Sequence, residues 1–156
     1  MANTTAICNT YKQEILQGLH LAANTYKISL IKVGATGTYN ASMTNAGTPN
    51  NSSGGTPTTA NIGTDEVAAS GSYAAGGLTL ASFSATLQTS TGCLDFATAS
   101  ATTATISATG AMIYNSSVTN RAVATFDFGG TITSTAGTFT LTMPTVGAAT
   151  SLIRIA

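Results

Sequence analysis

The chain has 156 residues, of which five are basic, five are acidic and one is histidine, so the net charge is zero and only 6% of residues are charged. Soluble domains average about 25% charged residues. Because charged side chains keep monomers apart and supply most acid–base and metal chemistry, this composition argues against an enzyme and favours a surface that lies against other proteins. Five scattered basic residues also make a nucleic-acid partner unexpected.

Length and composition predict one all-β domain. Hydrophobic residues make up 43% of the chain, and it contains 31 threonines and 16 glycines. Threonine is β-branched and favours extended backbone. No apolar segment approaches the roughly 20 residues that span a bilayer, so we expect no membrane contact. Met1–Thr5 has neither the basic nor the apolar part of a secretory signal, so we expect none.

The first twenty residues predict the one helix of the chain. The apolar side chains that share a helical face are Ile7, Tyr11, Ile15 and Leu19, with Leu16 beside them. Asn3 or Thr4 would cap the start of this helix, and Gly18 weakens its end. Lys12 and Glu14 lie off the apolar stripe. A terminal helix of this kind packs across an open sheet or reaches to a neighbouring subunit.

We therefore assign residues 1–22 to a helix or arm and residues 23–156 to the β domain. Its first strand is expected at Tyr26–Val33. Residues 34–64 contain no charge and consist mainly of Gly, Asn, Thr, Ser and Pro, so they predict a long loop. Loops of this length are usually functional or mobile. The alternatives are a flexible surface loop and an arm that a neighbouring subunit orders.

Alternating apolar and polar residues predict a series of short strands in the rest of the chain. These strands are expected at residues 78–87, 93–96, 104–108, 112–114, 123–128, 138–143 and 151–155. A change of phase near Ala81–Ser82 indicates a bulge or bend, and glycine pairs such as Gly129–Gly130 indicate turns. Seven or eight short strands without alternating helices predict a β-sandwich or jelly roll.

Few residues could carry chemistry. His20 is the only histidine; it is expected at the surface or at the helix end, and no Gly-x-Ser-x-Gly motif accompanies it. Asp65 and Glu66 are expected in a turn, and in extended backbone they would point to opposite sides. A paired-carboxylate site would then need Asp95 or Asp127. Capping a turn or bridging to a lysine is the favoured role for these carboxylates.

No metal or cofactor is expected, because the sequence has no cluster of His, Cys, Asp or Glu with ligand spacing. A calcium ion held by backbone carbonyls and one or two of the acidic side chains is the alternative. Cys8 and Cys93 lie far apart and are expected to be buried free thiols. Asp127 and Arg154 would pair if their strands were neighbours.

One resemblance rests on seven segments spread over the chain. They are Met1–Cys8, Glu14–Gly18, Gly63–Val67, Ala74–Leu80, Gly110–Asn115, Ala122–Gly129 and Leu152–Ile155. Together they resemble a family of small proteins, mostly unnamed, that are encoded near the capsid genes of tailed bacteriophages. The resemblance covers nearly the whole chain except residues 34–62, and no catalytic or binding motif comes with it.

This resemblance implies a non-enzymatic virion protein, made in the bacterial host cytoplasm and then placed on the capsid surface. A small jelly-roll decoration (cement) protein fits the size and the β-rich sequence, with the major capsid protein as partner and a dimer or trimer as its own state. The alternatives are a tail or head–tail connector component and a host-surface-binding head fibre module. The residues expected at a subunit interface are Ile7, Tyr11, Ile15, Leu19, Leu152, Ile153 and Ile155. The same residues would otherwise complete the domain's own core.

Overall fold

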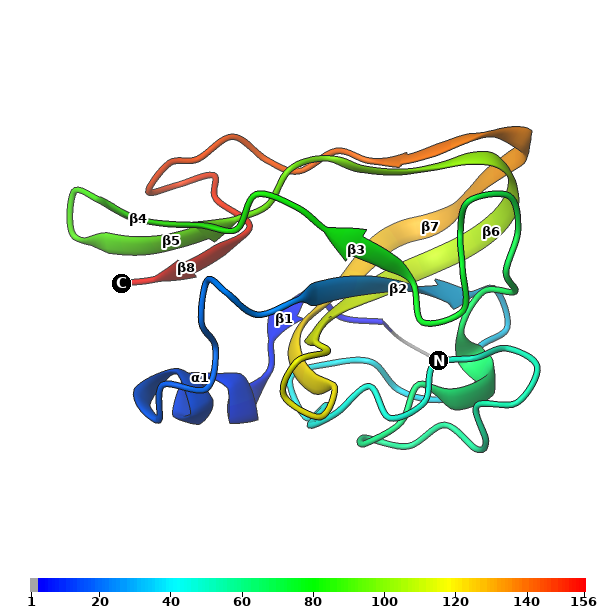
Figure 1. Ribbon diagram of the computed structural model, residues 1–156, viewed down its shortest axis with the longest axis horizontal. Helices are drawn as coiled ribbons and strands as arrows, with labels where there is room; N and C mark the ends of the chain where they lie inside the picture. The colour runs from blue at the N-terminus through cyan, green and yellow to red at the C-terminus, as the bar shows by residue number, and fades with distance from the viewer. Residues whose placement is uncertain (1–2) are drawn as a thin grey trace.

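The computed structural model describes residues 3–156, and within them the chain forms two antiparallel sheets and one α-helix (Figure 1). The strands are β1 (Ala6–Ile7), β2 (Tyr26–Lys32), β3 (Leu78–Leu80), β4 (Ser84–Gln88), β5 (Thr91–Asp95), β6 (Ala99–Asn115), β7 (Arg121–Leu141) and β8 (Ile153–Ile155). The helix α1 spans Asn9–Leu16, and a 3₁₀ turn, η1, spans Gly63–Asp65. One sheet has the order β1-β7-β6-β2-β3 and the other β4-β5-β8. The predicted all-β class is confirmed.

A long hairpin of β6 and β7 belongs to the five-stranded sheet and also leads into the other one. The predicted strands at 104–108 and 112–114 are parts of β6, and those at 123–128 and 138–143 fall largely within β7. The turn predicted at Gly129–Gly130 is wrong, because both residues lie inside β7. Ala108 pairs with Ile132 and Gly110 with Asp127, so four residues of β7 face one residue of β6.

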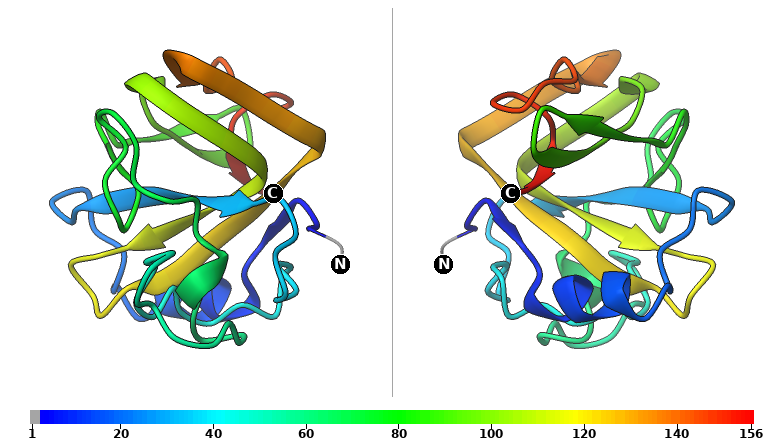
Figure 2. Two further views of the ribbon diagram at one scale, coloured as in Figure 1. Left: turned by 90° about the vertical axis from the view of Figure 1, so that its right-hand side faces the viewer. Right: turned by 90° about the vertical axis from the view of Figure 1, so that its left-hand side faces the viewer.

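This bulge bends the hairpin, since an insertion in one strand increases the local twist. Gly129 has φ 71°, a backbone conformation that glycine adopts without steric cost. The bend divides the hairpin into an inner half, next to the turn between the two strands, and an outer half, residues 99–108 and 132–141. The outer half turns away from the inner half (Figure 2). At the open end of the hairpin, β5 comes directly before β6 in the chain. On the other strand, residues 142–152 connect β7 to β8.

The core lies between the layers that the hairpin connects. Its fully buried side chains include Leu30, Ile31, Ile106 and Met112, and Phe139 from the outer half of the hairpin is also buried. β2 ends one residue earlier than predicted, and the phase change near Ser82 separates β3 from β4, which lie in different sheets. Ser82 has φ 56°, in agreement with the predicted bend.

The helix is shorter than predicted. Ile7 pairs with β7 as part of β1, and Cys8 occupies the N-cap position without a side-chain cap. The prediction that Asn3 or Thr4 caps the helix is wrong, because the Asn3 side chain bonds to β6 and the Thr4 amide bonds to the long loop. Gly18 has φ 70° and follows the helix end, as glycine does after many helices. Met1 and Ala2, part of the predicted helix, lie outside the described residues.

The loop at 34–64 is tied to the rest of the chain by buried side chains and hydrogen bonds. Its Tyr39, Met43 and Ile62 side chains are fully buried and join the main core. The Asp65 carboxylate, also buried, accepts hydrogen bonds from the Thr36 and Gly37 main-chain N–H groups and from the Tyr39 hydroxyl. A turn-capping role was among those expected for this carboxylate, and the structure assigns it to Asp65.

Glu66 is fully buried and closes a second polar network. Its carboxylate accepts hydrogen bonds from the Ser29 hydroxyl, the Tyr73 hydroxyl and the main-chain N–H of Gly76. Burial raises the pKa of this carboxyl above its ordinary value, and these donors and the charge of Lys27 act in the opposite direction. The network fixes the loop to β2 and to the segment before β3.

Candidate functional site

His20 lies beyond the helix end, but its side chain is only 1% exposed, so the expectation of a surface residue is wrong. Its Nε2 lies 2.8 Å from Glu14 Oε2, and its Nδ1 lies 3.2 Å from Asn115 Nδ2. The Asn115 side-chain oxygen accepts from the Ser117 main-chain N–H, which leaves its amide group to donate to Nδ1. Nε2 therefore carries the proton and donates to Glu14. Both ring nitrogens are engaged, and neither is left to activate a nucleophile.

Glu14 is buried, although the helical pattern places it off the apolar stripe. Besides His20, it binds Arg121, whose Nη1 lies 2.6 Å from Glu14 Oε1. Arg121 begins β7, so this carboxylate fixes α1 to the hairpin. The Tyr11 ring packs edge-on against His20 with 4.5 Å between the ring centroids. The Glu14 carboxylate thus faces inward because His20 and Arg121 compensate its burial.

The other charged residues do not gather into a site. Asp95 accepts from the main-chain N–H of Leu152, and the exposed Asp127 accepts from that of Gly129. Arg154 donates to carbonyls of the preceding loop. The condition for an Asp127–Arg154 pair, that their strands be neighbours, is not met, because β7 and β8 belong to different sheets. Asp65 and Glu66 serve separate networks in the fold.

Cys8 and Cys93 are buried and free, as predicted. Burial, together with the nearby Glu14 carboxylate, raises the pKa of the Cys8 thiol to about 12, so this thiol stays protonated. Residues 3–156 contain no group of three or more His, Cys, Asp or Glu side chains placed to hold a metal ion. In the same part of the chain, no helix is both long and apolar enough to cross a bilayer.

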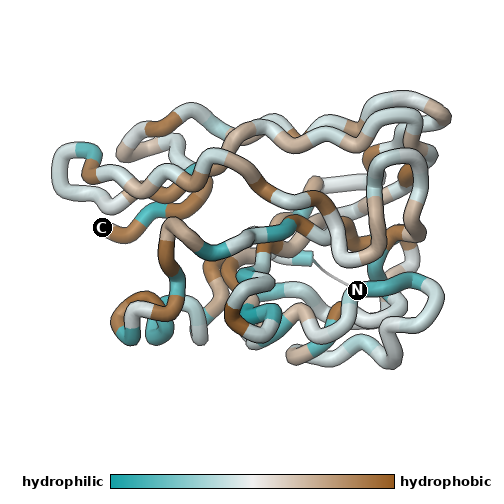
Figure 3. Tube along the Cα trace, in the orientation of Figure 1, coloured by the Kyte–Doolittle hydropathy of each residue, from teal (hydrophilic) through white to brown (hydrophobic). Residues whose placement is uncertain are grey.

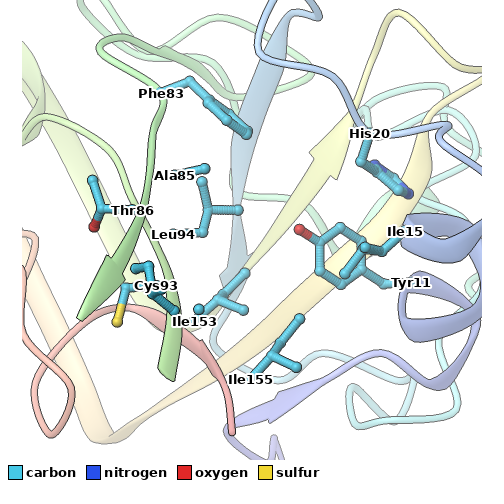
Figure 4. A pocket seen from close by; sticks show the side chains of 12 residues that line it. Tyr11, Ile15, His20, Phe83, Ala85, Thr86, Cys93, Leu94, Ile153 and Ile155 are labelled. Carbon is cyan, nitrogen blue, oxygen red and sulfur yellow. The ribbon is translucent and has the colours of Figure 1, made fainter. Parts of the chain in front are cut away.

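The most distinctive surface feature is an apolar cleft of about 370 Å³ between α1 and the β4-β5-β8 sheet (Figure 4). The strand register places two rows of residues on the sheet face that lines the cleft. The first row is Ala85, Leu94 and Ile153, and the second is Leu87, Gly92 and Ile155. Tyr11, Ile15 and His20 form the opposite wall. The lining contains no Lys, Arg, Asp or Glu.

The fold covers only part of this apolar face. Leu94 and Ile153 of the first row are buried, whereas Leu87 and Ile155 of the second row are 72% and 50% exposed. Leu16, which follows Ile15 on α1, is 90% exposed. Figure 3 shows that both the helix region and the C-terminal strand carry hydrophobic segments. The apolar face of the cleft therefore extends beyond what the fold itself buries.

Four of the seven predicted interface residues meet at this cleft, namely Tyr11, Ile15, Ile153 and Ile155. Ile7 and Leu152 line a second hollow, between β1 and the C-terminal segment, and Leu19 lines neither. Sequence reasoning did not assign Phe83, Leu87 or Leu94 to an interface. The alternation over 83–87 puts the first two on one face of a strand, but only the register with β5 brings Leu94 beside them.

Tyr11 brings a hydroxyl group to the cleft, whose other polar side chains are His20 and Thr86. The residue is 4% exposed, and Figure 4 shows its hydroxyl oxygen directed toward the cleft centre. Among residues 3–156 this hydroxyl has no hydrogen-bond partner. Burial, with Tyr26 nearby, raises the pKa of Tyr11, so the hydroxyl remains a neutral donor.

Comparison with known proteins identifies no family for this chain. No protein-family model matches the chain, and neither the curated proteins nor the solved structures contain a match. Any role of the cleft must therefore be argued from the residues that form it.

Proposed function

We propose that this chain is a non-enzymatic structural protein of a tailed-phage virion, namely a decoration protein that binds the major capsid protein on the shell surface. The observation that carries this proposal is the half-covered apolar face between α1 and the β4-β5-β8 sheet. In a chain with ten charged residues, such a face favours permanent contact with other subunits. The resemblance of seven segments to phage proteins encoded near capsid genes points the same way.

The stabilising mechanism would be added buried area across shell subunits. Exposed threonines line the outer half of the β6–β7 hairpin and form a neutral surface; they include Thr102, Thr105, Thr133 and Thr135. Contact through such a surface desolvates few charges. A standard interface of about 1,600 Å², repeated over a shell, resists internal pressure through many simultaneous contacts.

The architecture also suits a small surface-bound protein. Two layers joined by a bent hairpin favour a β-sandwich over a jelly roll, because the strands divide five to three rather than four to four. A non-enzymatic role agrees with His20, whose two ring nitrogens are both engaged within the fold.

The deciding experiment is the copy number of this chain in purified particles, measured by quantitative mass spectrometry against the major capsid protein. A decoration protein is expected at a simple ratio to the capsid protein, because its binding sites scale with the shell. A dozen or fewer copies per particle would instead indicate a tail or head–tail connector component. Binding to host cells by particle-free protein would favour the head-fibre alternative.

A further inference from the structure

The outer half of the β6–β7 hairpin has two edges, and the chain covers one of them. On the β6 side, the turn at residues 70–73 lies against the strand. The Ser72 main-chain N–H donates to the Thr102 carbonyl, and the Ser72 hydroxyl accepts from the Thr102 N–H. The Ser70 hydroxyl accepts from the Thr105 N–H. These main-chain groups of β6 are therefore engaged within the chain.

The β7 side of the same half is open. β1 pairs with β7 only at residues 124–125, and among residues 3–156 no strand other than β6 pairs with residues 132–141. Further hydrogen bonds of this segment, at Ser134, Ala136 and Thr140, also lead to β6. Figure 2 shows this orange part of β7 at the rim of the molecule. Because alternate residues of an antiparallel strand turn their N–H and C=O groups away from the paired strand, this edge presents a row of main-chain donors and acceptors.

Two common protections of a long edge strand are missing here. Natural proteins place charged side chains or proline on such edges, since an open edge pairs with other extended chains. The sequence has no charged residue between Asp127 and Arg154, and residues 132–141 contain no proline. β3 and β8, which also lie at sheet edges, have only three residues each. The β7 edge is thus the long, unprotected one, and it favours the addition of a further strand.

We infer that this open edge binds an extended, uncharged segment of the major capsid protein, which joins the sheet as a strand beside residues 132–141. The inference rests on the proposed decoration role and states how the shell partner is held. Main-chain N–H and C=O groups of the added strand pair with those of β7, as in other cases of recognition by strand addition. Hydroxyl and β-branched side chains fit opposite the exposed threonines of β7, whereas a charged side chain would meet no opposite charge there.

The shape of the edge favours a different chain over a second copy. Ala136 has φ 46°, so the strand is irregular near the middle of residues 132–141. A two-fold pairing of this edge with itself would bring the two Ala136 positions together and interrupt the ladder at its centre. A strand of another sequence need not carry an irregularity at that point.

The test is the binding of the purified full chain to shells prepared without it, measured as copies per capsid protein over a concentration series. Thr133→Lys/Thr138→Lys adds one charge on each side of Ala136 at exposed positions, and lysine is a natural guard of edge strands. This double variant should need at least about 10-fold more protein to half-saturate the shell. The matched control is Ser53→Lys/Thr59→Lys, which places the same two charges on exposed residues of the long loop and should bind like the wild type.

Hydrogen–deuterium exchange of the wild-type chain tests the strand pairing directly, and it needs no variant. Amide protons on the open edge should exchange quickly in the free chain, because they face water. On the shell they should exchange at least about 10-fold more slowly, because they are then hydrogen-bonded. Residues 99–108 of β6 already pair with β7 and contact the turn at 70–73, so their exchange should change little.

Three results would overturn the inference. The first is a folded Thr133→Lys/Thr138→Lys variant, checked by circular dichroism, that binds shells as tightly as the wild type. The second is unchanged exchange over residues 132–141 in the bound chain. In both cases the copy number of the wild type still tests the decoration role, so the two proposals fail separately.

The third result is a dimer of the free chain, seen by sedimentation velocity, that Thr133→Lys/Thr138→Lys dissociates, because the edge would then hold a second copy. A wild-type chain that does not bind shells would overturn both the decoration role and the inference.

Discussion

The long loop at 34–66 and the cleft beside α1 both consist largely of uncharged residues, yet they use polar and apolar groups in opposite ways. In the loop, Asp65 and Glu66 each collect several donors, and Tyr39 and Ile62 are buried in the core. In the cleft, Leu87 and Ile155 are exposed, and the Tyr11 hydroxyl has no partner within residues 3–156. The polar groups of the loop are satisfied within the chain, whereas the apolar face of the cleft is only partly covered by it.

The largest effect is expected from a truncation in the loop. Ile62→Ala removes a fully buried side chain that packs into the main core, so the free energy of unfolding should fall by about 3 kcal/mol. Urea unfolding followed by circular dichroism measures this change. Val146→Ala, at an exposed position, should alter stability by less than about 0.5 kcal/mol. Equal effects of the two variants would mean that the loop is not part of the core.

A somewhat smaller effect is expected when the polar network of the loop is broken. Asp65→Asn replaces one acceptor oxygen with an NH₂ group that faces the donors of Gly37 or Thr36, and it should cost about 2 kcal/mol. Asp127→Asn is the control, because Asp127 is exposed and accepts one local hydrogen bond. Urea midpoints that move equally in both variants would contradict a specific role for the Asp65 network.

Glu66 should make stability depend on pH. Its pKa in the folded protein is raised above the ordinary value of 4.5, so the folded state favours the protonated carboxyl. This contribution to stability is fully present below about pH 4.5 and is lost as the pH rises through the raised pKa. Unfolding free energies measured across this range should decline in the wild type.

The matched variant is Glu66→Gln, which does not titrate and should remove this part of the decline. Asp127→Asn should retain it, since Glu66 is unchanged there. A wild type and a Glu66→Gln variant with parallel pH profiles would show that Glu66 is not the group responsible.

The smallest effect on the single chain is expected at the rim of the cleft. Leu87→Gln exchanges a side chain that is 72% exposed, so the unfolding free energy should change by less than about 0.5 kcal/mol. Leu94→Ala, on the same sheet face but buried, should cost about 3 kcal/mol. A large loss at Leu87 would mean that the second row belongs to the core of one chain.

The sequence predicts the short strands of this fold better than its long ones. Alternation at Leu78–Leu80 gives a strand with the observed bounds, and the strand expected at residues 93–96 overlaps β5, which also includes Thr91 and Gly92. The long hairpin is missed because Thr103, Ala136 and Gly129 interrupt the alternation with positive φ angles inside continuous strands. Such bulges shift the phase of the pattern, and a shifted phase is indistinguishable from a strand boundary in sequence.

The cleft is predicted only in part, for a related reason. Spacing along the helix identifies Tyr11 and Ile15, and the apolar end of the chain identifies Ile153 and Ile155. That these two segments face each other across one cleft depends on the pairing of β8 with β5, which is a long-range contact. The inward position of Glu14 also follows from distant partners, His20 and Arg121, rather than from the helix itself.

The placement of the β6–β7 hairpin late in the chain has a consequence for synthesis. β1 pairs with β7 across more than a hundred residues of intervening sequence, and β2 finds its longer partner only in β6. A chain emerging from the ribosome can form only the small β2–β3 and β4–β5 pairs before β6 and β7 appear. The apolar strand β2 therefore has only its short partner β3 until β6 is made, and the five-stranded sheet is complete only after β7 has been synthesised.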